Sequence, residues 1–244
     1  MKHNDDLPGP PRPARSAERV VVALDVPDRA QALGLVEMLG DAVLWYKVGM
    51  ELFYAEGAGL VEELGRREKK VFLDLKLHDI PNTMASALRS LTRLPIHLTT
   101  LHAAAGPEAL DACAAVVRER TGAGRPALGL LGVTRLTSLP PPEPKRPWDD
   151  VVELAGMAVR AGLDGWIAPA AAAPALRQAH GANPVLVCPG IRLPEHERQD
   201  QVAVGTPEAA VAGGADWIVV GRPVTRAADP RAAVEAILAR LDGA

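Results

Sequence analysis

The chain has 244 residues, 48% of them hydrophobic and 23% charged, which is the composition of a globular protein rather than a disordered one. Its 27 Lys and Arg against 30 Asp and Glu give a net charge of −3, which argues against a surface that binds nucleic acid. No apolar run reaches the roughly 18 residues of a membrane span, and the first residues lack the apolar core of a signal peptide. Two cysteines are too few for a disulfide framework. We therefore expect a soluble cytoplasmic protein with no membrane partner.

Short aliphatic runs alternate with amphipathic segments along most of the chain. Residues 1–18 carry four prolines among polar residues and are predicted to form a flexible tail ahead of a single domain that covers residues 19–244. Eight strands are predicted, over residues 20–24, 44–48, 71–75, 96–101, 127–133, 165–168, 185–187 and 217–220. Helices are predicted between them, among others over residues 29–39, 55–66, 84–94, 107–120, 151–161 and 207–212. The proline-rich stretch 139–147 is predicted to be a loop, too short to separate domains.

Eight strand–helix units in one domain predict an α/β fold, specifically a (β/α)8 TIM barrel. The competing fold is a doubly wound open sheet, which usually has a glycine-rich turn after its first strand. Here that turn is Asp25-Val-Pro-Asp28, without glycine. The barrel is therefore the favoured fold.

Polar residues follow most of the predicted strands at their C-terminal ends, where TIM barrels place their chemistry. Only the sixth predicted strand ends without them, in Ala168-Pro169-Ala170. The polar residues at the other strand ends are Asp25, Lys47, Asp74 with Lys76, His102, the segment 134–138, Arg192 and Gly221-Arg222.

The third predicted strand carries the densest charge. Side chains alternate along a strand, so Val71, Leu73, Leu75 and Leu77 are predicted to face the helices. The other face, which points into the barrel, carries Phe72, Asp74, Lys76 and His78. Burial of an aspartate and a lysine is costly unless they pair.

The pair Asp74–Lys76 has two interpretations, one structural and one catalytic. A buried ion pair that only sets the strand register is the structural one. A second carboxylate at Asp79 favours the catalytic one, because two acids near one lysine hold it protonated and ready to deliver a proton.

The last two strand ends predict an anion site. Gly221 permits close backbone approach, and amides at a following helix N-terminus, with Arg192 and Arg222, would bind phosphate. Either arginine alone is more often a solvated surface charge. His102 is favoured as a core histidine over a catalytic one, Cys113 and Cys188 as buried packing residues, and no ligand spacing predicts a metal site.

The segment Asp74-Leu-Lys-Leu-His-Asp-Ile-Pro-Asn-Thr83 resembles the signature of the orotidine 5′-phosphate decarboxylase family. The resemblance extends along nearly the whole chain after the tail, through the segments 22–25, 47–53, 133–138, 189–192 and 218–222. It implies an enzyme that decarboxylates orotidine 5′-phosphate to UMP in de novo pyrimidine biosynthesis, and it implies no cofactor and no metal.

The resemblance also implies a catalytic role for each charged residue. Lys76 would donate the proton to C6 of the pyrimidine, with Asp74 and Asp79 beside it in an alternating charge network. Asp25 and Lys47 would contact the ribose hydroxyls.

Further substrate contacts are implied in the same way. Asp79, Ile80 and Thr83 would reach into the site of a neighbouring subunit, so the resemblance implies a homodimer with shared active sites. Thr137 and Ser138 would close on the base. The phosphate would be bound by Arg192, Gln201, Gly221 and Arg222; Gln201 is matched only by its distance to Thr206-Pro207.

The sequence departs from the family pattern in places, among them the alanine-rich stretch 169–174 after the sixth predicted strand, and two other functions compete with the one that the resemblance implies. Cys188 stands where the family pattern has threonine, and the loop after Ser138 is unusually rich in proline. Magnesium-dependent sugar-phosphate decarboxylases and synthases share the Asp-x-Lys-x-x-Asp spacing, but the continuation Ile80-Pro-Asn-Thr83 favours the pyrimidine enzyme. A silent nucleotide-binding protein would be expected to lack at least one of the charged positions, and all are present.

Overall fold

The computed structural model describes residues 12–139, 148–193 and 205–243. Eight parallel strands form a closed barrel in chain order, and β8 pairs with β1 to close it. The strands are β1 Val20–Ala23, β2 Trp45–Gly49, β3 Lys70–Leu77, β4 Leu98–His102, β5 Gly129–Val133, β6 Gly165–Ile167, β7 Val185–Cys188 and β8 Trp217–Val220. The predicted TIM barrel is confirmed.

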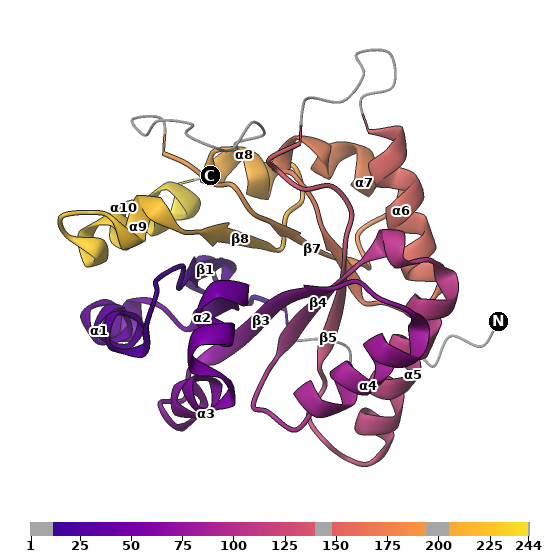
Figure 1. The fold of residues 1–244 in the computed structure, drawn as a ribbon. Coiled ribbons are helices and arrows are strands. Elements are labelled where there is room, and N and C mark those ends of the chain that lie inside the picture. Colours follow the sequence, from indigo (N-terminus) through magenta and orange to yellow (C-terminus); the bar gives the residue numbers. More distant parts are fainter. Residues whose placement is uncertain (1–11, 140–147, 194–204, 244) are drawn as a thin grey trace.

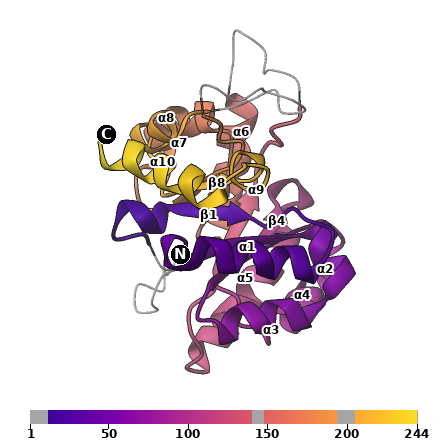
Figure 2. The ribbon, with the colours of Figure 1, turned by 90° about the vertical axis from the view of Figure 1, so that its left-hand side faces the viewer.

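Helices surround the barrel on all sides (Figures 1 and 2). They are α1 Arg29–Leu39, α2 Met50–Glu56, α3 Ala58–Arg66, α4 Pro81–Leu91, α5 Pro107–Gly122, α6 Asp149–Arg160, α7 Ala173–His180, α8 Pro207–Ala212, α9 Arg222–Thr225 and α10 Pro230–Asp242. Short 3-10 turns cover Ser16–Arg19, Gly40–Ala42, Ala103–Ala105 and Ala170–Ala172. Within the described ranges, no helix is long and apolar enough to cross a bilayer.

The alternation of side chains along the strands divides the apolar core into two layers. One face of β3 sends Val71, Leu73 and Leu75 into the layer between strands and helices, as predicted. The other sends Phe72 into the barrel interior, where Trp45 and Trp217 pack edge to face with ring centroids 5.3 Å apart. This apolar layer lies inside the barrel, below the C-terminal ends of the strands.

Two predicted helices differ from the structure by more than two residues at one end or are divided. The helix predicted over 55–66 is divided, because Gly57 has φ +64° and ends α2 in a conformation that L residues rarely adopt. The helix predicted over 84–94 begins three residues earlier, at Pro81, because the fixed φ of proline suits a first helical position.

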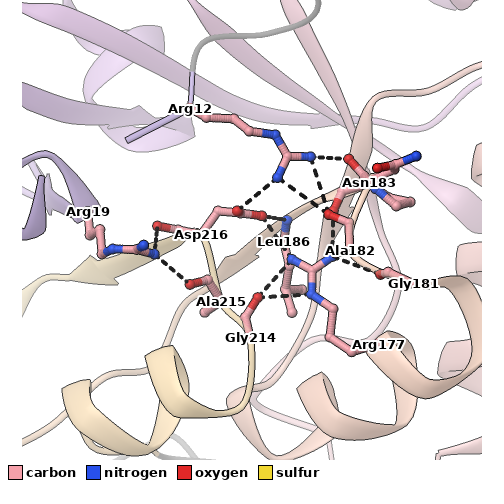
Figure 3. A network of polar contacts seen from close by, with 11 residues as sticks. Arg12, Arg19, Arg177, Gly181, Ala182, Asn183, Leu186, Gly214, Ala215 and Asp216 are labelled. Carbon is pink, nitrogen blue, oxygen red and sulfur yellow. Dashed lines mark hydrogen bonds and ion pairs between the residues drawn. The ribbon is translucent and has the colours of Figure 1, made fainter. Parts of the chain in front are cut away.

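Residues 12–19, which precede β1, lie against the N-terminal ends of β7 and β8, opposite the ends where we expect the chemistry (Figure 3). The guanidinium of Arg12 donates to Asp216 at 3.2 Å and to backbone carbonyls of residues 182–183. Arg19 donates to the carbonyls of Ala215 and Asp216. Residues 1–11 of the predicted tail lie outside the described residues, so flexibility of the tail stays a prediction.

Candidate active site

A cavity of about 400 Å³ opens at the C-terminal ends of the strands. Strands β1, β2, β3, β5, β6 and β8, with the segments that follow several strands, contribute to its wall. The lining residues are Ala23, Asp25, Lys47, Glu51, Phe72, Asp74, Lys76, Val133, Arg135, Leu136, Thr137, Ile167, Pro189, Gly190, Arg192, Val219, Gly221, Arg222 and Arg226. Most of the residues singled out from the sequence therefore meet in one place.

Four charged side chains of alternating sign run along one wall of this cavity. The ammonium of Lys47 lies 2.9 Å from Asp25 and 3.7 Å from Asp74. The ammonium of Lys76 lies 2.6 Å from the same oxygen of Asp74. Each buried charge thus has a neighbour of opposite sign, which offsets the cost of burial.

The charge array keeps its central members ionised. Burial favours the neutral form of Asp74, but the ammonium groups of Lys47 and Lys76 outweigh it and hold the pKa of this carboxyl below its usual value. Burial lowers the pKa of Lys47, and the carboxylates of Asp74 and Asp25 more than restore it, so the pKa is raised. The array therefore places a fixed negative charge between two ammonium groups.

Lys76 has a left-handed backbone conformation, with φ +50°. Between the pairs Leu73–Thr99 and Leu77–Leu101, β3 advances four residues while β4 advances two. This irregularity is a β-bulge, a feature that often re-aims a side chain beside an active site. A left-handed conformation is costly for a residue other than glycine. The regular alternation of side chains along β3 does not predict this conformation at Lys76.

Another part of the cavity wall, formed by the segments after β7 and β8, carries positive charge. Arg192, which is buried, lines the cavity together with Gly221 and Arg222. The helix that follows β8, α9, is a single turn of four residues and sums few peptide dipoles, so its contribution to an anion site stays a prediction. The guanidinium groups, to which Arg226 adds a third, supply the positive charge.

The segment after β5 supplies one predicted residue and one that was missed. Thr137 lines the cavity, whereas Ser138 is exposed and does not. Arg135 also lines the cavity, and its guanidinium lies 2.5 Å from Asp150 at the start of α6. The place of Arg135 in the segment after a strand end was the signal that could have identified it.

Asp79, Ile80 and Thr83 do not line the cavity of their own chain. All three are exposed, and Ile80 leaves 66% of its surface accessible. Asp79 accepts a hydrogen bond only from the neighbouring amide of Ile80, at 2.7 Å, among the interactions of the described residues.

Two histidines stand beside the array without reaching the cavity. The rings of His78 and His102 are 5.1 Å apart, and burial, followed by the charges of His78 and Lys76, lowers the pKa of His102. Gln201 lies outside the described residues. In the described part of the chain, no three His, Cys, Asp or Glu side chains are placed to hold a metal ion.

Comparison with known proteins relates this geometry to one family. A family model described as orotidine 5′-phosphate decarboxylase / HUMPS family matches residues 18–237. The orotidine 5′-phosphate decarboxylase of Stenotrophomonas maltophilia is 45% identical over 234 residues, 93% of this chain and 94% of that protein. The protein of the same name from Moorella thermoacetica is 42% identical over 233 residues, 92% of each chain. The crystal structure of orotidine 5′-phosphate decarboxylase from Lactobacillus acidophilus superposes with a TM-score of 0.78 at 37% identity, covering 92% of this chain and 99% of that one.

Proposed function

The chain belongs to the orotidine 5′-phosphate decarboxylase / HUMPS family and decarboxylates orotidine 5′-phosphate to UMP in pyrimidine biosynthesis, and we propose that Lys76 is the group that protonates C6 of the pyrimidine. The observation that carries this role is the alternating array Asp25–Lys47–Asp74–Lys76 on one wall of the cavity. Lys76 is the last member of this array, and its side chain lines the cavity.

The reaction makes a specific demand on this wall. When the bond between C6 and the carboxylate breaks, carbon dioxide leaves and the electron pair stays on C6, where the ring delocalises it poorly. An ammonium held beside C6 stabilises the developing charge before it delivers its proton. Asp74 holds that ammonium in place and, as a charged group in a buried position, needs no reorganisation during the reaction.

The arginine-lined wall supports a role in binding the phosphate. Guanidinium groups match phosphate oxygens in bidentate fashion, and Arg192, Arg222 and Gly221 line the cavity on the side formed by the segments after β7 and β8. Phosphate binding in TIM barrels commonly uses these two loops. We assign Gln201 to the same group only on its sequence match.

The ribose and base contacts follow from the remaining lining residues. Asp25 and Lys47, paired at 2.9 Å, present a carboxylate and an ammonium that suit the ribose hydroxyls. Thr137 is proposed to approach the base from the segment after β5, and Ser138 with it. No step in this scheme needs a metal or an organic cofactor.

The exposed residues after β3 support a homodimer with shared sites. Asp79, Ile80 and Thr83 cannot serve the cavity of their own chain in this arrangement, and Ile80 exposes a large apolar side chain. A second copy of the chain would bury that side chain and receive Asp79 in its cavity. A cytoplasmic location is proposed because the substrate and product are charged nucleotides, which cross bilayers poorly.

The test of the proposed function is the decay of orotidine 5′-phosphate absorbance in the ultraviolet after addition of purified protein, with and without EDTA. Decay at the same rate in both samples supports metal-free decarboxylation. Decay that EDTA abolishes would overturn the metal-free scheme. A folded protein that binds UMP and causes no decay would overturn the assignment of this array to catalysis.

A further inference from the structure

Among the described residues, neither strand β4 nor the segment that follows it contributes a lining residue to the cavity, whereas β7, which also contributes none, is followed by the lining residues Pro189, Gly190 and Arg192. Its inward-facing residue at mid-strand is Thr100, which is fully buried. The side chain lies behind the charge array rather than in the cavity wall. Direct contact with a substrate is therefore not its role.

The hydroxyl of Thr100 bonds to both residues at the centre of the array. The backbone N–H of Lys76 donates to Thr100 Oγ1 at 3.0 Å. Thr100 Oγ1 in turn lies 2.8 Å from Asp74 Oδ1. Because the ionised carboxylate can only accept and the amide can only donate, the single hydroxyl proton must point to Asp74.

These two bonds complete a ring. Asp74 Oδ2 accepts from the ammonium of Lys76 at 2.6 Å, while Oδ1 accepts from Thr100, which is bonded back to the amide of Lys76. Both oxygens of Asp74 are thereby oriented, and both ends of Lys76 are held. Rotation of the carboxylate would break one bond of the ring.

The bulge in β3 makes the Thr100 hydroxyl necessary. The left-handed conformation of Lys76 and the change of register toward β4 remove its N–H from the regular ladder. A partly buried N–H without an acceptor is costly, and the Thr100 hydroxyl supplies one. Thr100 therefore stabilises the backbone conformation of Lys76, and that conformation directs the Lys76 ammonium toward Asp74.

We propose that Thr100 is a positioning residue for the decarboxylation, which acts by holding the Lys76 ammonium and the Asp74 carboxylate in their reactive arrangement. The inference rests on the proposed role of Lys76 as proton donor. Its prediction is a loss in kcat with little change in KM, because Thr100 bonds to Lys76 and Asp74 and, among the described residues, to none of the arginines that are proposed to bind the phosphate.

The chain offers a matched control in the adjacent residue. Thr99 is also fully buried on β4, but it points to the helix layer and donates to the carbonyl of Leu73 at 3.0 Å. Thr100→Val and Thr99→Val each remove one buried hydroxyl at nearly constant volume. Thr100→Ser keeps the hydroxyl and loses only the methyl group.

Steady-state kinetics and thermal unfolding of these three variants test the proposal. We expect Thr100→Val to lower kcat by about 10- to 100-fold, the scale on which small displacements of reacting groups act, with KM within about threefold of wild type. Thr100→Ser should recover most of the loss. Thr99→Val should lower the melting temperature to a similar extent as Thr100→Val and keep kcat.

A pH profile separates positioning from a general loss of stability. Asp74 is faced by Lys47 from β2, Lys76 from β3, and Thr100 and His102 from β4. Loss of the Thr100 hydrogen bond removes one of the interactions that keep the pKa of Asp74 low. The acidic limb of kcat should therefore move to higher pH in Thr100→Val and stay in place in Thr99→Val.

Several outcomes would overturn the inference. They are a Thr100→Val variant with wild-type kcat, a Thr99→Val variant with an equal loss, and a Thr100→Ser variant no more active than Thr100→Val. If Thr100→Val does not fold, low kcat in a folded Thr100→Ser variant overturns it as well. Full turnover in Lys76→Ala would instead refute the proposed function, so the two failures are distinguishable.

Discussion

The ammonium of Lys76 lies 2.6 Å from the carboxylate of Asp74, although the two residues are separated by only one position on β3. In a regular strand, residues two apart stand roughly parallel at about 7 Å. The left-handed conformation of Lys76 re-aims its side chain toward Asp74. The surrounding ring of hydrogen bonds offsets the energetic cost of that conformation. Strain at this position is consistent with a functional role.

Removal of the Lys76 ammonium should abolish turnover. Lys76→Ala takes away both the proposed proton donor and the charge that stabilises C6, so kcat should fall by at least about 10²- to 10⁴-fold. UMP binding, measured by calorimetry, should persist, because the arginine wall is intact. Lys70→Ala is the matched control: Lys70 begins the same strand and contacts His97 at 3.2 Å, far from the cavity, and its loss should leave kcat unchanged. Near-normal turnover in Lys76→Ala would refute the proposed role of Lys76.

A mixture of two inactive variants should regain activity if sites are shared between subunits. In a mixed dimer of Lys76→Ala and Asp79→Ala chains, one site receives both substitutions and the other receives neither. With random exchange of subunits in a two-fold dimer, about one quarter of the wild-type activity should appear. The measurement is specific activity after joint refolding. Its control is each variant refolded alone. Mixtures that form dimers and stay inactive would contradict the shared-site proposal.

Loss of Arg222 should weaken recognition of the phosphate. A charge-assisted hydrogen bond contributes about 1.5–3 kcal/mol, so Arg222→Ala should lower kcat/KM for orotidine 5′-phosphate by roughly 10- to 150-fold. Turnover of orotidine, which lacks the phosphate, should be the same in the variant and the wild type. Arg231→Ala removes an arginine of α10 paired with Glu235 and should affect neither substrate. An equal loss with orotidine would place Arg222 elsewhere than at the phosphate.

Because of Asp164, the free energy of unfolding should fall as the pH rises through the weakly acidic range. It precedes β6 and accepts from the amide of Leu130 at 2.8 Å, without a salt bridge to the described residues, and burial raises its pKa to about 6. The folded state therefore binds a proton more tightly than the unfolded state. That contribution to stability is complete below about pH 4 and is lost between pH 4 and 6, by at most about 3 kcal/mol.

Asp164→Asn removes this pH dependence while it keeps an acceptor for Leu130. Chemical denaturation should show a variant at least as stable as the wild type at pH 7, with a flatter profile between pH 4 and 6. Asp216 is the counterpart before β8, where it accepts from Leu186 and pairs with Arg177 at 2.9 Å (Figure 3). Asp216→Asn should destabilise the protein, because it leaves a partly buried guanidinium without its carboxylate. Destabilisation by both variants would contradict this difference.

Local pattern was sufficient for the fold class and for most of the proposed site. Eight aliphatic runs with helical segments between them predict the barrel because strand and helix periodicity are properties of neighbouring residues. In a parallel barrel all strand ends meet at one rim, so the polar residues after the strands had to converge there. Asp25, Lys47, Asp74 and Lys76 were predicted on this ground, together with the family resemblance.

Tertiary structure alone decided how these residues meet. The role of Thr100 depends on the register between β3 and β4, which brings it to Asp74 across 26 positions of sequence. The left-handed conformation of Lys76 is set by that same pairing, since strand propensity and alternation predict a regular strand. Arg135 was missed because its approach to the cavity depends on the course of the chain after β5. Register and loop path are fixed by contacts between residues far apart in sequence, and these contacts leave little signal in any local stretch of the chain.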